Sequence, residues 1–439
     1  MAPGAKIPET TTDALDARGA ARRRRSSAPH TAISESCKEL RSLRWVLAAR
    51  GLRAFGDGFV SLLLPLYLLS LGYTPVDVGI IATATLLGSG TLTLALGLHA
   101  HRFRTRILLL GGAAMMTATG LSFAAITDFW PLLVVAVVGT LNPSSGDVSL
   151  FLPLEHALLA QSTSPGTRTS WFARYSLVGA LLAAVGSLCA ATPDWLAHHG
   201  VSERAGFQSM FALYALLGVA CGLCYRRLPV HASEEPAADR TTLRQSRRTV
   251  YTLAALFSLD AFAGGLIVQS MLALWLFQRF GLSPATAGLI FFWTGVLSSL
   301  SYLVATRIAG RIGLVYTMVF THLPSSVLLI LVPFAPSLPA CIALLLVRSA
   351  LSQMDVPTRS AFVMSVVPAQ ERAAAASVTA VPRSLASSSS PLLAGYLLAT
   401  STFGWPLVVA GVLKVGYDLM LLAVARKMPT EHAEPTNAD

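Results

Sequence analysis

The chain has 439 residues, of which 54% are hydrophobic and only 13% are charged, and its mean hydropathy is +0.61. So little polar surface excludes a water-soluble globular protein and indicates an integral membrane protein, with the lipid bilayer as its first partner. The formal net charge is +11. The basic residues lie in the N-terminal tail and in short connections between apolar stretches, so we expect them to encode membrane topology and not to bind nucleic acid.

The N-terminal segment 1–43 is rich in Ala, Thr, Ser and Arg and carries a run of four arginines at 22–25. It has no apolar periodicity, which predicts a disordered cytoplasmic tail. No short apolar core follows its early charges, and this argues against a cleaved signal peptide. The acidic residues of the segment argue against an organelle transit peptide.

Twelve mainly apolar stretches follow, each of about 20 or more residues and therefore long enough to cross roughly 30 Å of hydrocarbon. They are predicted near 44–71, 76–98, 106–127, 131–157, 170–191, 206–225, 250–279, 285–306, 314–335, 338–358, 374–400 and 404–425. The sequence thus predicts an all-α integral membrane protein with twelve transmembrane helices. A polar cytoplasmic linker at 228–249 separates the N-terminal half, 44–227, from the C-terminal half, 250–426, and a cytoplasmic tail at 427–439 follows.

The two halves resemble each other in sequence. The segment 74–106 recurs without a gap as 283–315, with Pro75 matching Pro284 and Gly79 matching Gly288. The period of this repeat is about half the chain, and its units can each cross a bilayer. Such a repeat indicates a transporter made of two pseudo-symmetric halves.

The connections alternate in charge. Arginines and lysines concentrate in the tail, in the connections near 102–106, 168, 226–248, 307–311 and 372, and at 426–427, whereas the other connections hold little beyond Arg204 and Arg279. By the positive-inside rule both termini are expected in the cytoplasm. We expect a multi-pass protein of the cell membrane, with a bacterial inner membrane as the leading expectation.

Charged residues also occur inside the predicted spans. The first span carries Arg53 and Asp57, and the twelfth carries Lys414 and Asp418, each pair four residues apart on one helical face. A charge at the bilayer centre costs about 2.5–3.5 kcal/mol on insertion scales, so these groups must pair or line a wet cavity. For both spaced pairs, an ion pair that only locks packing stays open beside a functional role. The other charged or polar positions are Asp147, Glu155 and His156 in the fourth span, Arg174 in the fifth, Asp260 in the seventh, Arg348, Gln353, Asp355 and Arg359 in the tenth, and Arg383 in the eleventh.

Position within the spans separates these residues. Glu155, His156, Arg174 and Arg359 fall near predicted cytoplasmic ends, where anchoring at the interface or gating is expected. Asp57, Asp260 and Arg348 fall well inside the bilayer. Asp147 and Asp355 occupy corresponding places in the fourth and tenth spans, which are interrupted by Asn142, Pro143, Pro153 and Pro357. Breaks in corresponding helices of two repeats indicate the substrate path.

Other kinds of site find little support. The five cysteines form no disulfide framework, and the Cys221-x-x-Cys224 pair is expected to pack within a helix. His322 is expected to pack or to form a hydrogen bond and not to bind metal. No nucleophile with a partner, metal-ligand cluster or phosphate-binding glycine loop is evident, so we expect no enzyme, no metal and no cofactor.

The chain resembles the major facilitator superfamily. The family signature between helices 2 and 3, Gly-x-x-x-Asp-Arg-x-Gly-Arg-Arg, is matched in part by Gly97, His101, Arg102, Arg104, Thr105 and Arg106, and its repeat by Gly310, Arg311 and Gly313. His101 and Gly310 stand in the place of the acid, so the usual Asp-centred relay does not carry over. Glu155 paired with the Arg102–Arg106 cluster is the expected substitute. The expected gating residues are Arg102, Arg104, Arg106, Glu155 and Arg311.

Other family motifs are also incomplete. The helix 4 arginine motif is missing from the segment 139–147 and has its counterpart in Arg348, while the Gly-Pro motif of drug:proton antiporters is absent from helix 5. Helix 11 keeps part of that motif in Ser390, Pro391 and Gly395. The drug-antiporter assignment is weakened accordingly.

The resemblance implies that helices 1, 4, 7 and 10 line a central cavity. The expected proton-coupling and substrate-cavity residues are Asp57, Arg53, Asp147, Asp260, Arg348, Asp355, Gln353 and Arg383. The leading hypothesis is a secondary transporter that works as a monomer by alternating access and exports a small organic solute in exchange for protons. The alternative is uptake or exchange of an anionic metabolite bound by Arg348, Arg53 or Arg383. A non-transporting sensor with a transporter fold is the third reading.

Overall fold

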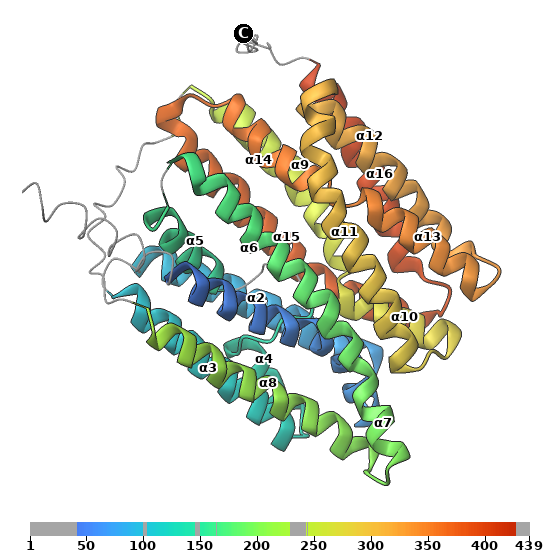
Figure 1. Cartoon of the computed structure of the whole chain (residues 1–439). Helices are drawn as coiled ribbons and strands as arrows, with labels where there is room; N and C mark the ends of the chain where they lie inside the picture. The colour runs from blue at the N-terminus through green and yellow to red at the C-terminus, as the bar shows by residue number, and fades with distance from the viewer. Residues whose placement is uncertain are drawn as a thin grey trace, which may run out of the picture.

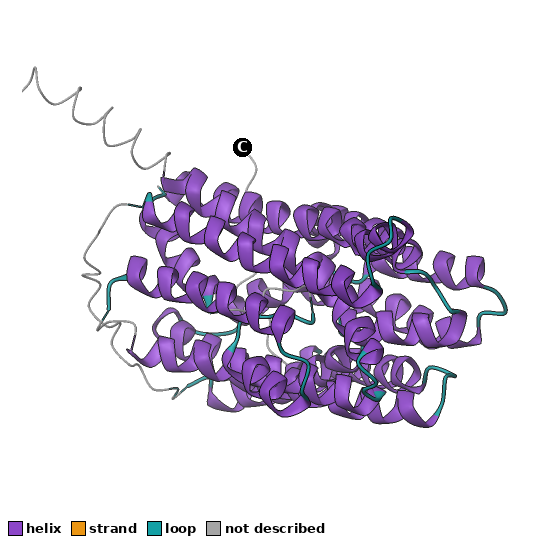
Figure 2. Ribbon diagram, turned by 90° about the horizontal axis from the view of Figure 1, so that it is seen from below, coloured by secondary structure: helices purple, strands orange, loops and turns teal. Residues whose placement is uncertain are grey.

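The computed structural model describes residues 42–99, 103–144, 150–163, 165–228, 243 and 245–426, and this part of the chain is helical and contains no strand (Figure 2). Nine of its helices are long and apolar enough to cross a membrane. Arg102, Asp147, the N-terminal tail and most of the predicted linker lie outside the described residues.

The N-terminal half begins with a long helix, Ser42–Ser70. It is followed by α2 (Pro75–His99), α3 (Thr105–Ala125), α4 (Phe129–Val138), α5 (Phe151–Gln161), α6 (Pro165–Leu188), the short η2 (Cys189–Ala191), α7 (Thr192–His198) and α8 (Glu203–Arg226). Local sequence sets several of these bounds. Gly72, at φ +88°, turns the chain before α2, and the Ser202 hydroxyl accepts a hydrogen bond from the Ala205 amide at the start of α8.

The C-terminal half consists of α9 (Arg247–Leu266), α10 (Gln269–Phe280), α11 (Pro284–Ile312), α12 (Leu314–Leu331), η3 (Val332–Phe334), α13 (Leu338–Leu351), α14 (Asp355–Ser365), η4 (Ala369–Glu371), α15 (Arg372–Thr400) and α16 (Trp405–Ala425). The predicted twelve-span architecture in two halves is confirmed. Figure 1 shows the blue-to-green helices of the first half beside the yellow-to-red helices of the second.

Three spans are built from two helices each, because the chain breaks inside them. Span 4 breaks after Gly139, span 7 breaks at Ile267 and Val268, and span 10 breaks at 352–354. The predicted break at Asn142 and Pro143 is therefore present. Pro153 and Pro357 instead fall in the first turns of α5 and α14, where a missing N–H is tolerated. The break in span 7 contains no proline, but the pair Gly264 and Gly265 lies just before it.

The two ends of the bundle can be told apart by the chain direction. We call the end where helix Ser42–Ser70 begins and α16 ends the tail face, and the opposite end the far face. Near the far face the halves approach closely: Gly79 of α2 faces Pro391 and Gly395 of α15, and Gly288 of α11 faces Ser187 of α6. The Ser187 hydroxyl also donates to the Gly288 carbonyl over 3.1 Å. Small residues permit this backbone contact.

The helix α15 differs from its neighbours in composition. It carries a serine run, Ser387–Ser390, and two internal prolines, and it is not among the nine helices apolar enough to cross a membrane. It packs against α9 of its own half and against α2 of the other half. Its small side chains allow these contacts, since a Cβ at Gly265 of α9 would collide with Ser390 and with the Ser387 carbonyl.

Candidate transport site

A fully buried carboxylate organises the polar interior of the N-terminal half. Glu155 of α5 forms a salt bridge with Arg53 of the first helix. It also accepts hydrogen bonds from the hydroxyls of Tyr175 in α6 (2.5 Å) and Tyr225 in α8 (2.7 Å). Four helices therefore meet at one side chain, and three donors stabilise its negative charge.

Two more charges accompany this pair on the first helix. Arg50 lies over the ring of Tyr175, 5.2 Å from its centroid, and Gly179 of α6 leaves room for its guanidinium. Asp57 accepts a hydrogen bond from the Asn142 amide over 3.4 Å. Asp57 thus lies against the broken segment of span 4, where irregular backbone inside a membrane protein is expected to line a cavity.

The structure corrects the expectation for Glu155. It does not sit at the interface paired with the basic connection at 103–106, because its partners are Arg53, Tyr175 and Tyr225 inside the bundle. In that connection Arg106 donates instead to the Arg226 carbonyl over 2.7 Å. Arg174 fits the interface expectation, since it is exposed and lies over Trp171.

Asp260 of α9 occupies the centre of a second buried cluster, in the C-terminal half. The Lys414 Nζ of α16 lies 2.6 Å from its Oδ1, and Arg359 of α14 lies 3.1 Å from its Oδ2. Arg359 also forms a salt bridge with Asp355, one turn earlier in α14. The expectation that Arg359 reaches the interface was wrong, because it is 7% exposed and held by two carboxylates.

The same cluster contains His322 of α12. Its Nδ1 lies 2.9 and 3.0 Å from the two carboxylate oxygens of Asp418 in α16. Its Nε2 lies 3.5 Å from Lys414 Nζ and 3.6 Å from Asp260 Oδ1. The predicted hydrogen bond of His322 is confirmed. Lys414 and Asp418, which share a face of α16, find their partners in α9 and α12.

Each half thus ties its first span to its fourth with an ion pair, and the polarity is reversed between the halves. In the N-terminal half the first span supplies Arg53 and the fourth supplies Glu155. In the C-terminal half the corresponding spans supply Asp260 and Arg359. The two halves pair the same spans with opposite polarity, through residues that are not at equivalent positions of the repeat.

The remaining predicted cavity residues lie elsewhere in the C-terminal half. Arg348 of α13 has a buried Nε without a hydrogen-bond partner, and it forms no ion pair with any described residue. Gln353, in the break of span 10, accepts a hydrogen bond from the Tyr302 hydroxyl over 3.1 Å. Arg383 of α15 is exposed, yet it lies within electrostatic range of Arg359 and Asp260.

The described residues contain neither a cluster of metal-ligating side chains nor a disulfide bond. No group of three or more His, Cys, Asp or Glu side chains there is placed to hold a metal ion. Cys189, Cys221, Cys224 and Cys341 are free thiols, and the Cys221 Sγ approaches the Ala49 carbonyl at 3.6 Å.

Comparison with known proteins assigns the family. The sequence model described as Major Facilitator Superfamily matches residues 46–276 and 253–439. The chain belongs to the major facilitator superfamily. It is therefore a multi-pass membrane transporter.

Among its relatives in the superfamily is a Saccharomyces cerevisiae protein, uncharacterized membrane protein YJR124C, which is 26% identical over 90% of this chain and 96% of its own length. A solved structure of a bacterial homolog of the human lysosomal transporter Spinster, inward-facing and occupied, has a TM-score of 0.69 at 13% identity, covering 90% of this chain and 98% of that one. The nucleoside transporter NupG has a TM-score of 0.67 at 13% identity, covering 88% and 100%. The human organic anion transporter MFSD10 has 0.63 at 16%, covering 87% and 99%. These structures share the fold.

The repeated connections of the superfamily lie at the tail face. Arg104 directly precedes α3, and Arg311 is exposed in the last turn of α11. Gly313 then adopts φ +85° and turns the chain into α12, which explains a glycine at this place of the repeat.

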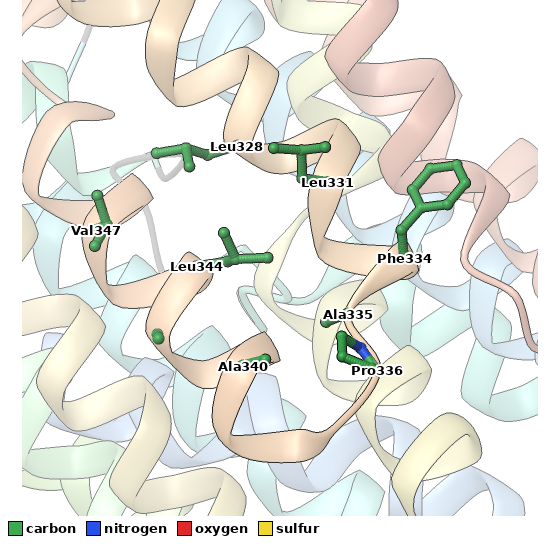
Figure 3. A pocket seen from close by; sticks show the side chains of 9 residues that line it. Leu328, Leu331, Phe334, Ala335, Pro336, Ala340, Leu344 and Val347 are labelled. Carbon is green, nitrogen blue, oxygen red and sulfur yellow. The ribbon is translucent and has the colours of Figure 1, made fainter.

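An apolar pocket lies away from both charged clusters, between α12, η3 and α13 (Figure 3). It is lined by Leu328, Leu331, Phe334, Ala335, Pro336, Ala340, Ala343, Leu344 and Val347. Leu331, Phe334 and Val347 are about half exposed, as expected for side chains that face lipid. With no charged group in its lining, this pocket does not suit a polar solute.

Proposed function

We propose that this protein is a secondary active transporter of a small organic solute, that it works by alternating access, and that it exports the solute in exchange for protons. The observation that carries the proposal is the placement of a buried, charged cluster in each half, while the halves meet through small residues near one face. Such charges inside a membrane protein indicate a solute or proton pathway.

The direction of the chain in the membrane follows from its charges. The basic connections support a cytoplasmic tail face, with both termini inside the cell membrane. A bacterial inner membrane is one location, and the yeast relative adds a eukaryotic membrane as another. Contacts between Gly79 and Gly395 and between Ser187 and Gly288 then close the outer side. Because one chain holds both halves, a monomer suffices.

The proposed solute cavity lies between the halves at the broken spans. Asp57 and Asn142 flank the break in span 4, and the Pro143 carbonyl of that break accepts a hydrogen bond from the Ser270 amide at the start of α10, in the other half. Asp147, Arg348, Gln353 and Arg383 are proposed to complete the lining, while Arg102, Arg104, Arg106 and Arg311 gate the tail face.

A second candidate is uptake or exchange of an anionic metabolite. Arg348 favours it, because a guanidinium that has no ion-pair partner among the described residues is a ready ligand for a carboxylate or phosphate. A structural neighbour with the same fold, MFSD10, is an organic anion transporter.

The test uses proteoliposomes that contain the purified protein and a trapped pH dye, challenged with cationic, neutral and anionic compounds. Proton movement that a compound triggers supports coupled transport and gives the charge class of the solute. Movement of a radiolabelled compound without proton movement contradicts the coupling. Silence towards all compounds, in folded protein, favours the non-transporting sensor.

Arg348→Gln separates the two candidates. For an anionic solute we expect the variant to lose binding, whereas transport of a cation or a neutral compound should continue. Arg174→Gln is the matched control, because that arginine is exposed and lies over Trp171. Equal loss in both variants would remove Arg348 from the solute site.

A further inference from the structure

The cluster of the C-terminal half carries unequal numbers of buried charges. Its carboxylates are Asp260, Asp355 and Asp418, and its basic side chains besides His322 are Arg359 and Lys414, all at most 9% exposed. Charges buried together without balance are costly, so the cluster needs one more positive charge. Arg383 of α15 lies within electrostatic range of Asp260 and Asp355, but it is exposed and forms no ion pair with them, so it is not one of the buried charges of the cluster. A bound proton supplies the missing charge.

His322 is the side chain placed to receive this proton. Its Nδ1 faces both oxygens of Asp418, an arrangement that assigns the hydrogen to Nδ1 and leaves Nε2 as the free ring nitrogen. Nε2 faces a donor, the Lys414 ammonium at 3.5 Å, and an acceptor, Asp260 Oδ1 at 3.6 Å. A neutral imidazole accepts from Lys414, and a protonated one donates to Asp260.

We propose that the cluster around His322 is a proton-binding site, with Nε2 of His322 as the atom that takes the proton. The use of this site in coupling rests on the proposed function, but its existence does not. The groups that face it are Asp260 of α9, Lys414, Tyr417 and Asp418 of α16, and Arg359 with Asp355 of α14.

The position of Asp260 connects proton binding to the helices. Lys414 Nζ and His322 Nε2 both lie near Oδ1 of Asp260, while Arg359 forms a salt bridge with Oδ2 of Asp260. A proton on Nε2 turns the imidazole into a second donor to Oδ1 and repels the Lys414 ammonium. The Lys414–Asp260 interaction between α16 and α9 weakens, whereas the His322–Asp260 interaction between α12 and α9 strengthens. Protonation therefore changes which helix Asp260 holds.

The described residues of the N-terminal half show no such imbalance. Their buried charges are Arg50 and Arg53 against Asp57 and Glu155, two of each sign. Those charges balance without a proton. The comparison favours proton binding in the half that contains His322 over Asp57, one of the expected proton-coupling residues.

The first experiment needs no variant. Histidine is the side chain that ordinarily changes charge between about pH 5 and 8, so we expect nitrogen NMR of ¹⁵N-histidine-labelled protein to show one imidazole that titrates from an Nδ1–H neutral form to a doubly protonated form. The resonance is assigned by its loss in His322→Asn, with exposed His199→Asn as the control. An imidazole of His322 that keeps one protonation state from pH 5 to 9 overturns the proposal.

Neighbouring charges give shifts of opposite sign. Asp418→Asn removes a negative charge and should lower the proton affinity of His322 at least tenfold, moving its midpoint down by one pH unit or more. Lys414→Met removes a positive charge and should move the midpoint up. If the titration midpoint of His322 is unchanged in both variants, its imidazole does not interact with these charges, and the proposed cluster is contradicted. The double variant His322→Asn/Asp418→Asn has balanced charges and no titratable ring, so it is expected to fold.

Transport separates this inference from the proposed function. In the double variant we expect exchange of labelled solute across proteoliposomes to continue, while accumulation driven by a pH gradient is lost. Retained proton-driven accumulation contradicts the site. If the wild-type protein moves solute without protons although His322 titrates as expected, the coupling in the proposed function fails and the proton site stands.

Discussion

The buried charges of the protein are held by side chains from several helices: Arg53, Tyr175 and Tyr225 surround Glu155. The buried positions of Asp57 and Asp260 could be predicted, because a carboxylate deep inside an apolar span has no other place to go. The partners could not. Tyr175 and Tyr225, which hold Glu155, occur in the spans like any packing aromatic, and the contact that reveals them joins residues distant in sequence.

Glu155→Gln is the sharpest test of this residue's role. The substitution leaves Arg53 buried without its carboxylate, and breaking a buried pair in this way typically costs about 3–5 kcal/mol. We expect a clear drop in the melting temperature of the detergent-solubilised protein. The double variant Arg53→Gln/Glu155→Gln should recover much of the loss, and a single variant as stable as wild type would show that the pair does not hold the half together.

Asp57→Asn is expected to behave differently. The described buried charges of the N-terminal half balance without a proton. The variant should therefore keep proton-driven transport while its solute affinity changes, since Asp57 lies against the break at Asn142. Flux driven by a pH gradient, compared with equilibrium exchange, measures the two effects separately. Loss of the proton-driven flux alone would return the coupling role to Asp57.

At the scale of the elements, sequence predicts spans well and interruptions unevenly. The break in span 4 could be predicted from Asn142 and Pro143. Span 7 instead breaks at Ile267 and Val268, residues that are common in apolar helices. The contact of Ser270 with Pro143 brings the two breaks together across the halves. Such a break is stabilised by tertiary contacts, which no local pattern records.

The helix contacts near the far face can be tested with a single methyl group. A Cβ at Gly395 would lie 2.5 Å from the Pro75 carbonyl oxygen and 3.0 Å from the Gly79 Cα, so Gly395→Ala should force α15 away from α2. We expect the distance between spin labels at Val201→Cys and Ala285→Cys, in a background whose native cysteines are replaced, to lengthen. Gly90→Ala, where a Cβ meets nothing within 4 Å, is the control. Equal distances in both variants would contradict this closure.

At the scale of the whole molecule, the twelve spans and the division into halves followed from apolar length and from the repeat at 74–106 and 283–315. The reversed ion pairs of the two halves could not be predicted, because the fold tolerates either polarity as long as opposite charges meet. Both halves pair their first span with their fourth, but with different residues and opposite charges.

The orientation of the molecule gives a simple labelling experiment. A membrane-impermeant maleimide added to whole cells should modify Val201→Cys in the far-face connection and leave Arg311→Cys at the tail face unmodified until the cells are opened. The basic residues of the tail-face connections are the physical reason. The opposite pattern would invert the chain and the proposed direction of transport with it.

The serine-rich helix α15 has a consequence for how the protein is made. With its serine run and its charged residues it has little tendency to leave the translocation channel for lipid on its own. Both helices that cover it, α9 and α2, precede it in the chain. During synthesis its partners are therefore already in the membrane when it emerges. We infer that the eleventh span inserts into the bilayer by packing against these earlier helices. Completion of the C-terminal half is then a late step, because α15 and α16 are the last of its helices to emerge.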